Sequence, residues 1–249
     1  MKKNFFKIAT IAMAALFTVC ACNKENNGNG GNGGNGGLKD DEDEDISSLH
    51  ASLQGSEYVT IALDEYSTAA LGKRIKASYQ VDDANVFLYV WEGTYTAGTA
   101  SGLNFYGEAA GWTSLVVGTV GWSGAGWCVE NPATVPAFVD SASDLSKWKF
   151  HIAYKGAANV AHIVILYWAD QVYKFAVGQG SLEDAGVAYN AIAPVSGTFT
   201  PGVWNEYEIS LDQTGMDYTK STKGNLAAVL SGGVTGTAID VDAIFFYKK

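Results

Sequence analysis

The chain has 249 residues, of which 47% are hydrophobic and 17% charged, and its formal net charge is −10. An acidic chain repels nucleic-acid phosphates and anionic lipid headgroups, so the composition argues against binding to either of them through charge. The length allows one large domain or two small ones.

The first 21 residues have the pattern of a secretory signal peptide. Three lysines precede an apolar run, residues 8–19, that is too short to span a bilayer as a helix. The run ends in Val19-Cys20-Ala21-Cys22, which resembles the lipobox of bacterial lipoproteins. This resemblance implies that Cys22 becomes the lipidated N-terminus, and its acyl chains would anchor the protein stably. An ordinary secreted protein with two unpaired cysteines is the alternative.

A flexible tether is expected after Cys22. Residues 26–37 are all Asn or Gly, which cannot bury apolar area, and residues 38–45 are a solvated, mostly acidic run. Without residues 1–21 the chain keeps 13 basic and 26 acidic residues, a formal net charge of −13. Cys128 is the only cysteine after Cys22, so we expect no internal disulfide and a small buried thiol.

Strand patterns recur through residues 46–249, where glycine is spaced like turn punctuation and the helical period is weak. Ala169-Asp170 fits a hairpin turn, and residues 225–230 are the best short helix candidate. We predict an all-β fold, an antiparallel β-sandwich of the jelly-roll type, as a single domain over 46–249. The predicted strands, which are β-rich or alternate in polarity, are 58–63, 86–91, 114–117, 148–154, 162–168, 171–177, 204–211 and 239–247.

Four segments in this order carry a resemblance to a known family: WKFHIAYKG (148–156), IVILYWADQVYKFAVG (163–178), PGVWNEYEISL (201–211) and IDVDAIFFYKK (239–249). Together they resemble the β-jelly-roll carbohydrate-binding modules with a galactose-binding-like fold. With the lipobox in front, the chain resembles surface glycan-binding lipoproteins of Bacteroidetes polysaccharide-utilisation systems. The resemblance covers roughly residues 55–249, and the stretch 92–140 matches no family pattern.

The resemblance implies a function and a location. It implies a lipid-anchored module of the outer membrane, exposed at the cell surface, that captures a glucan-like polysaccharide or oligosaccharide for degradation and uptake. An outer-membrane transporter and surface glycanases would be its partners, and the membrane would be contacted through the lipid anchor.

Seven tryptophans are the main candidates for contacts with sugar, because an indole offers a large, rigid, flat face. The stretch GWTSLVVGTVGWSGAGW (111–127) holds three of them, each preceded by glycine. Burying three indoles would need a core that this glycine-rich stretch does not supply, so we predict ligand contacts there; the alternative is that each glycine makes room for a core indole. Trp148 and Trp204 are predicted to be core residues. The predicted aromatic ligand contacts are Trp112, Trp122 and Trp127, with Trp91 and Trp168 balanced between ligand and core.

Polar partners for sugar hydroxyls are expected beside these tryptophans. Asn104 and Tyr106 precede Trp112 in the chain, and His151 and Lys155 share the face of their strand opposite its apolar face. An ordinary solvated side chain is the alternative for each.

No cofactor is expected to be required for binding, and a structural calcium ion is the one candidate. The family resemblance suggests it near the last strand, where Asp240 and Asp242 point to the same side and carry the oxygen ligands that calcium prefers. Two acids do not complete a six-oxygen site, and no His or Cys spacing supports zinc.

No catalytic motif is present in the sequence, and we predict a binding module rather than an enzyme. A glycoside hydrolase would need two carboxylates facing each other across a cleft, and Glu92, Glu108 and Glu130 border the tryptophan-rich stretch. A structural or adhesin-like surface protein, with every tryptophan in the core, is the third possibility.

Overall fold

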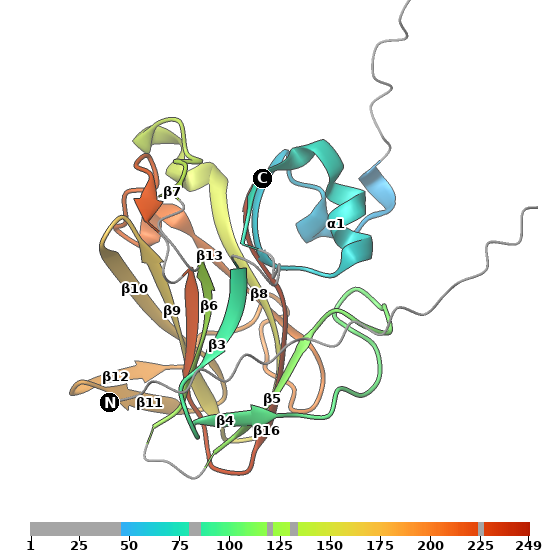
Figure 1. The fold of residues 1–249 in the computed structure, drawn as a ribbon, viewed down its shortest axis with the longest axis vertical. Helices are drawn as coiled ribbons and strands as arrows, with labels where there is room; N and C mark the ends of the chain where they lie inside the picture. Colours follow the sequence, from blue (N-terminus) through green and yellow to red (C-terminus); the bar gives the residue numbers. More distant parts are fainter. Residues whose placement is uncertain (1–45, 80–85, 119–121, 130–133, 224–226) are drawn as a thin grey trace, which may run out of the picture.

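The computed structural model describes residues 46–79, 86–118, 122–129, 134–223 and 227–249 (Figure 1). The predicted signal peptide, Cys22 and the tether lie outside the described residues. The described chain forms two β-sheets packed face to face, with one short helix, α1 (Glu65–Leu71). Five 3-10 turns accompany them: η1 (Ile46–Ser48), η2 (Ala51–Leu53), η3 (Gly72–Arg74), η4 (Ala142–Lys147) and η5 (Leu211–Gln213).

The first sheet, called sheet A, contains both the first and the last strand of the domain. Its order is β13-β8-β16-β1-β2, and β5 pairs with β16 and β4 with β5. All these pairs are antiparallel except β1 with β2. The strands are β13 (Asn205–Ser210), β8 (Trp148–Lys155), β16 (Ala238–Lys248), β1 (Glu57–Ala62), β2 (Ile75–Ser78), β5 (Thr113–Val117) and β4 (Tyr95–Ala97).

The second sheet, called sheet B, is antiparallel throughout, in the order β10-β9-β15-β6-β3. Its strands are β10 (Gln171–Gly178), β9 (Ala161–Trp168), β15 (Ala228–Gly232), β6 (Gly124–Val129) and β3 (Val86–Val90). Two small pairs complete the fold: the hairpin of β11 (Ser181–Asp184) and β12 (Val187–Asn190), and β7 (Thr134–Val135) with β14 (Thr222–Lys223).

The core lies between the two sheets and follows from alternation along each strand. In β8 the buried series Trp148, Phe150, Ile152 and Tyr154 faces sheet B. Fully burying each such side chain contributes about 1.5–3 kcal/mol from removal of apolar surface from water. The predicted core position of Trp148 is confirmed, since 1% of it is exposed.

The chain crosses between the sheets repeatedly. It passes from β5 in sheet A to β6 in sheet B, returns to β8 in sheet A and continues to β9 in sheet B. It later passes from β13 in sheet A to β15 in sheet B and back to β16 in sheet A, which is the pattern of a jelly roll. The predicted all-β antiparallel sandwich is therefore confirmed. The hairpin turn at Ala169-Asp170 is also confirmed, and both residues have positive φ (46° and 63°), as a two-residue type I′ turn requires.

The predicted helix at 225–230 is wrong over its described part. Ala228–Gly232 form β15, which pairs with β6 on one side and β9 on the other. Its apolar residues are held as a strand because both neighbouring strands need backbone partners. Among the described residues the one α-helix is α1, and Asp64 caps its first turn: the Asp64 Oδ1 accepts from the Ser67 amide at 2.8 Å.

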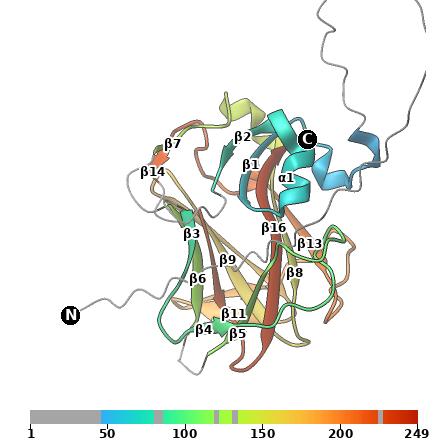
Figure 2. The same ribbon diagram turned by 45° about the vertical axis from the view of Figure 1, so that its right-hand side comes forward.

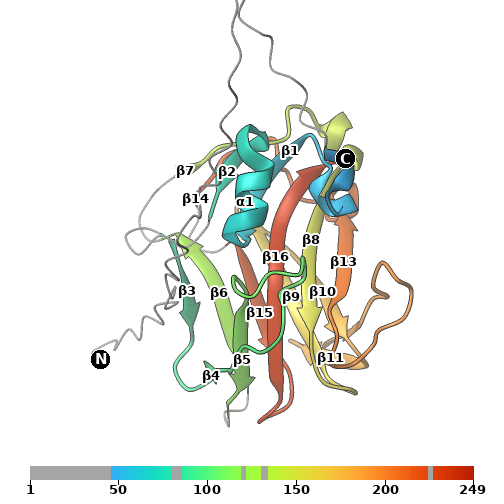
Figure 3. The same cartoon turned by 90° about the vertical axis from the view of Figure 1, so that its right-hand side faces the viewer.

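The two sheets differ in what lies on their outer faces. In Figures 2 and 3, α1 and the long connection from β4 to β5 lie over sheet A. On sheet B the β11–β12 hairpin packs against β9, where Leu182 and Tyr189 contact Ile163 and Ile165. Within the described part of the chain, no helix is long and apolar enough to cross a bilayer.

Candidate functional site

Two glycines of β6 lie on the outer face of sheet B. Strand β6 alternates, so Ala125 and Trp127 point into the core while Gly124 and Gly126 face outward. In the register of the sheet, Gly126 lies beside Tyr89 of the edge strand β3. At these two positions β6 therefore places no side chain on the outer face.

Two indoles rest over Gly124. A Cβ atom at Gly124 would lie 2.8 Å from Cε3 of Trp91 and 3.0 Å from Cζ3 of Trp122. The two rings contact each other edge to face, with centroids 6.0 Å apart and planes at 65°. Trp122 is 58% exposed, which is unusual for so large an apolar side chain. Glycine at position 124 is what allows both rings to lie against the sheet.

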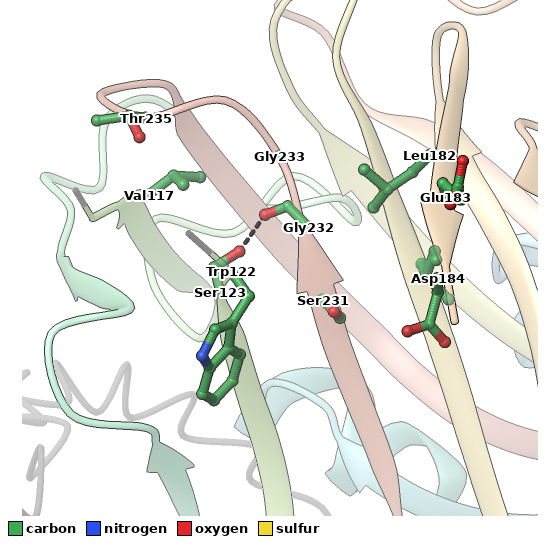
Figure 4. Close-up of a pocket in the computed structure, with 11 residues that line it drawn as sticks. Val117, Trp122, Ser123, Leu182, Glu183, Asp184, Ser231, Gly232, Gly233 and Thr235 are labelled. Atoms are coloured by element: carbon green, nitrogen blue, oxygen red, sulfur yellow. Dashed lines mark hydrogen bonds between the residues drawn. The ribbon is translucent and has the colours of Figure 1, made fainter. Parts of the chain in front are cut away.

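The β11–β12 hairpin forms a wall opposite Trp122. Figure 4 shows Leu182, Glu183 and Asp184 of β11 across an open cavity from the indole. An ion pair between Lys174 Nζ of β10 and Asp184 Oδ2 of β11, at 2.5 Å, joins the hairpin to sheet B. The cavity, called here the Trp122 cavity, has a volume of about 170 Å³ and is lined by Val117, Trp122, Ser123, Ile163, Leu182, Glu183, Asp184, Ser231, Gly232, Gly233 and Thr235.

Hydrogen bonds fix the backbone beside Trp122, on the side of the cavity opposite the β11–β12 hairpin. The hydroxyl of the buried Ser123 donates to the carbonyl of Gly232 (Figure 4), and the Tyr95 hydroxyl donates to the same carbonyl at 3.4 Å. The Ser123 bond joins the residue before β6 to the end of β15, and the Tyr95 bond joins β4 to the same point. Trp122 is thus an exposed side chain on a backbone that is held in place.

The chemistry of the Trp122 cavity is that of a site for an uncharged, polyhydroxylated ligand. It combines one exposed indole face with the hydroxyls of Ser231 and Thr235 and the carboxylates of Glu183 and Asp184. Among its described lining residues there is no Lys or Arg, and the nearby Lys174 is paired with Asp184. Such a site can accept and donate hydrogen bonds, but it offers no free positive charge to an anion.

Two predicted ligand contacts are corrected, because they are core residues. Trp127 is 2% exposed and packs between the sheets, and Trp168 is 1% exposed and contacts Phe138 and Tyr218. The Trp168 Nε1–H donates to the Lys220 carbonyl at 2.8 Å, so its one polar atom already has a partner. Neither indole presents a face to a ligand.

The remaining predicted aromatic contacts separate onto opposite sheets. Trp91 and Trp122 lie on sheet B, whereas Trp112 lies beside Lys155 on the outer face of sheet A. Trp204, which the sequence assigned to the core, also lies there and is only partly buried, with Lys155 Nζ 4.9 Å from its ring centroid. These tryptophans therefore lie on two separate surfaces.

Two predicted polar contacts, Asn104 and Tyr106, have structural partners instead. Asn104 is 2% exposed and closes its own loop: its Oδ1 accepts from the Glu108 amide at 2.7 Å and its Nδ2 donates to the Ala110 carbonyl at 3.1 Å. Tyr106 is hydrogen-bonded to the Ser52 hydroxyl at 2.9 Å, and burial raises its pKa well above the usual value. These two residues organise a loop and do not face the Trp122 cavity.

His151 is fully buried, although its strand parity placed it on the outward face. The connection from β4 to β5 covers it, and its ring is stacked on Phe245 with centroids 4.5 Å apart. Its Nδ1–H donates to the Ala243 carbonyl at 2.6 Å and its Nε2 is 3.0 Å from Oε1 of Glu206. His151 therefore holds together the bulge in β16 and is out of reach of a ligand.

The predicted calcium ligands do not fit a metal site as a pair. Asp240 forms an ion pair with Lys155 at 2.6 Å. Asp242 is 1% exposed and accepts from the Phe105 and Ala243 amides at 2.9 and 2.7 Å, while burial raises its pKa to about 6. Among the described residues, no three His, Cys, Asp or Glu side chains gather closely enough to hold a metal ion. No step below depends on a metal.

The side of the cavity that β11 supplies was not predicted from the sequence. A signal for it exists: SLEDAGVAYN (181–190) is a short pair of strands around Ala185-Gly186, and both of these residues have positive φ. The expected buried thiol is confirmed, since Cys128 is 7% exposed and burial raises its pKa to about 12.

No protein-family model and no curated protein matches the chain. Solved structures do. The family 30 carbohydrate-binding module of the cellulosomal cellulase CEL9D-CEL44B of Clostridium thermocellum is 13% identical, with 65% of this chain and 86% of that chain covered and a TM-score of 0.37. The family 11 module of the cellulosomal cellulase Lic26A-Cel5E of the same organism is 13% identical, with coverages of 68% and 90% and a TM-score of 0.36.

An exo-β-agarase is also similar, at 10% identity and a TM-score of 0.40, over 68% of this chain and 24% of that one. Similarity at this level concerns the arrangement of strands. The case for a ligand rests on the Trp122 cavity itself.

Proposed function

We propose that the chain is a non-catalytic polysaccharide-binding module and that the Trp122 cavity is its binding site. The observation that carries the proposal is the 58% exposed indole of Trp122, which rests on Gly124 and faces carboxylates and hydroxyls across an open cavity. A sugar ring has apolar C–H faces and a polar rim. The indole matches the face and the oxygens of β11 and β15 match the rim.

The shape of the cavity favours a chain bound at the surface over an enclosed monosaccharide. At about 170 Å³ the cavity is smaller than the pockets that bury most of a drug-sized ligand. The outward glycines of β6 extend the same surface toward Tyr89 and Trp91. A glucan-like polysaccharide laid across this face would contact Trp122 with one sugar and the neighbouring rings with others.

The proposal is tested by affinity gel electrophoresis of residues 46–249 in soluble polysaccharides, beginning with mixed-linkage β-1,3-1,4-glucan. We expect retardation by at least one neutral glycan and, for Trp122→Ala, an affinity at least about tenfold lower. Tyr66→Ala is the matched control, because Tyr66 is 65% exposed on α1, on the other sheet. Undiminished retardation of a folded Trp122→Ala variant would remove the proposed site.

A glycoside hydrolase is the alternative, and the site disfavours it. Glu183 and Asp184 are adjacent in β11, so they do not face each other across a cleft, and Asp184 is paired with Lys174. Of the acids considered from the sequence, Glu92 is exposed, Glu108 is half-buried in another loop and Glu130 lies outside the described residues. Release of new reducing ends from a glycan that binds would favour the enzyme.

A structural or adhesin-like surface protein is the other alternative. It would need all its tryptophans for the core, which disagrees with the exposure of Trp122. If the protein folds but no glycan in the panel retards it, this alternative is favoured.

We also propose that Cys22 is lipidated and holds the module at the outer-membrane surface, where it would work beside a transporter and surface glycanases. The described chain starts at Ile46 beside α1, on the sheet A side of the domain, away from the β11–β12 hairpin (Figure 1). A tether from that point supports presentation of the Trp122 cavity away from the membrane. Metabolic labelling with palmitate should be lost in Cys22→Ser and kept in Cys20→Ser, and intact cells should be labelled by an antibody to the domain.

A further inference from the structure

A second aromatic surface lies on the outer face of sheet A, and the strand register builds it. Asn205 pairs with Tyr154, which places Trp204 beside Lys155, and Lys155 pairs with Asp240 of β16. These three side chains therefore form one row across β13, β8 and β16. Trp112 closes the row from the start of β5, whose Ser114 pairs with Asp240.

The charged pair sits between the two indoles. Lys155 Nζ lies 4.9 Å from the ring centroid of Trp204 and 6.0 Å from that of Trp112. The same nitrogen is 2.6 Å from Oδ2 of Asp240. The row thus presents aromatic rings, an ammonium donor and a carboxylate acceptor within one strip of the surface.

The row is reachable from solvent. Trp112 and Trp204 are both only partly buried, and the side chains of Lys155 and Asp240 keep 18% and 11% of their exposure. Leu103, 55% exposed, adjoins Trp204, whose Nε1–H donates to the Leu103 carbonyl at 2.9 Å in an exposed position. If these residues served only to hold the β4–β5 connection on sheet A, no exposed apolar side chain would be needed beside them.

We infer that the Trp204–Lys155–Trp112 row is a second carbohydrate-contact site, separate from the Trp122 cavity. The inference rests on the proposed function for the class of ligand. A neutral sugar uses ring faces together with a donor and an acceptor, and the row supplies all three. An anion would have to compete with Asp240 for Lys155, and a cation would have to compete with Lys155 for Asp240. Because the two charges of this ion pair cancel, the pair favours hydroxyl groups over ions.

The core separates the two sites, since one lies on sheet A and the other on sheet B. One module would then contact two polysaccharide chains, or two segments of one long chain. Linked weak contacts strengthen binding to a repetitive polymer much more than to a short oligosaccharide.

The test is a titration of the ¹⁵N-labelled domain, residues 46–249, with mixed-linkage β-1,3-1,4-glucan oligosaccharides, followed by the indole N–H resonances. Trp→Phe variants assign them. We expect saturable shifts of the Trp204 and Trp112 resonances that persist in Trp122→Ala, and about fivefold weaker binding at this row in Lys155→Gln, which keeps the length of the side chain. Tyr66→Ala is the control, and in this variant the ligand-induced shifts of both sets of indole resonances should be the same as in the unmodified domain.

The outcomes separate this inference from the proposed function. If Trp122 shifts and Trp204 and Trp112 do not, the row is a clamp that holds the β4–β5 connection on sheet A, and the inference is overturned. If Trp204 and Trp112 shift, the Trp122 resonance does not shift and Trp122→Ala leaves the retardation by glycan unchanged, the row stands and the Trp122 cavity fails. If no indole shifts and no glycan retards the domain, both proposals fail together.

Discussion

At the scale of single residues, Gly124 decides whether two indoles can lie on sheet B. A side chain there would meet Trp91 at 2.8 Å and Trp122 at 3.0 Å, closer than ordinary carbon–carbon contacts. We expect Gly124→Val to displace the rings and to lower glycan affinity about tenfold or more, with a fold retained by circular dichroism. Val187→Ala is the control, because Val187 of β12 is 52% exposed. Unchanged affinity in Gly124→Val would mean that the rings do not contact the glycan.

His162 gives the fold a defined dependence on pH. It is fully buried, its Nδ1 is 3.0 Å from the Tyr154 hydroxyl, and burial lowers its pKa to about 3. The unfolded chain takes up a proton below about pH 6.5 and the folded chain does not, so His162 contributes stability that is lost as the pH falls from there toward 3.

By pH 5 the loss from His162 alone is about 2 kcal/mol, because each pKa unit corresponds to about 1.4 kcal/mol. The direct measurement is the pH titration of the His162 ring protons by NMR. They should not titrate between pH 7.5 and 4.5 in the folded protein and should titrate near pH 6.5 in urea. A midpoint near 6 in the folded state would show that the ring is hydrated.

At the scale of elements, strands with clear alternation were predictable and the glycine-rich ones were not. β8, β9 and β13 were predicted to within a residue at each end. β8 and β13 alternate in polarity, whereas β9 is a continuous run of β-branched, aliphatic and aromatic residues that is buried on both faces. β6 was missed because Gly124 and Gly126 weaken its strand propensity, although they are the residues that shape the site. Local sequence also could not distinguish Trp122 from Trp127, because both follow a glycine and only pairing with β3 and β15 fixes which side faces out.

The β11–β12 hairpin is the element that completes the site. Leu182 packs over Ile163 and closely over Gly232, while the Lys174–Asp184 ion pair is largely solvated and worth at most about 1 kcal/mol. We therefore expect Leu182→Ala to loosen the hairpin and to lower glycan affinity about threefold to tenfold, and Lys174→Gln to lower it about twofold or less. Binding is measured by affinity gels and folding by thermal melts. An equal effect of the two variants would contradict the assignment of the hairpin to apolar packing.

At the scale of the whole molecule, charge selects among polysaccharides. Residues 46–249 hold 11 basic and 19 acidic residues, a formal net charge of −8, and the described lining of the Trp122 cavity includes Glu183 and Asp184 but no basic residue. An anionic polysaccharide such as alginate meets repulsion both at long range and at the site, whereas a neutral glucan meets neither. We therefore expect alginate to leave the domain unretarded at low salt.

The same argument fixes the salt dependence. Binding to a neutral glucan should change less than about twofold between about 0.01 M and about 0.5 M NaCl, because screening acts only on charged partners. Glu183→Gln keeps the oxygen that can accept from a hydroxyl and removes one charge, so it should preserve glucan binding and reduce the discrimination against alginate. Tyr66→Ala, on α1 beside the other sheet and uncharged, should alter neither. Tighter binding of alginate than of glucan at low salt would show that an unpaired positive charge governs the site, which is opposite to the arrangement around Asp184 and Lys174.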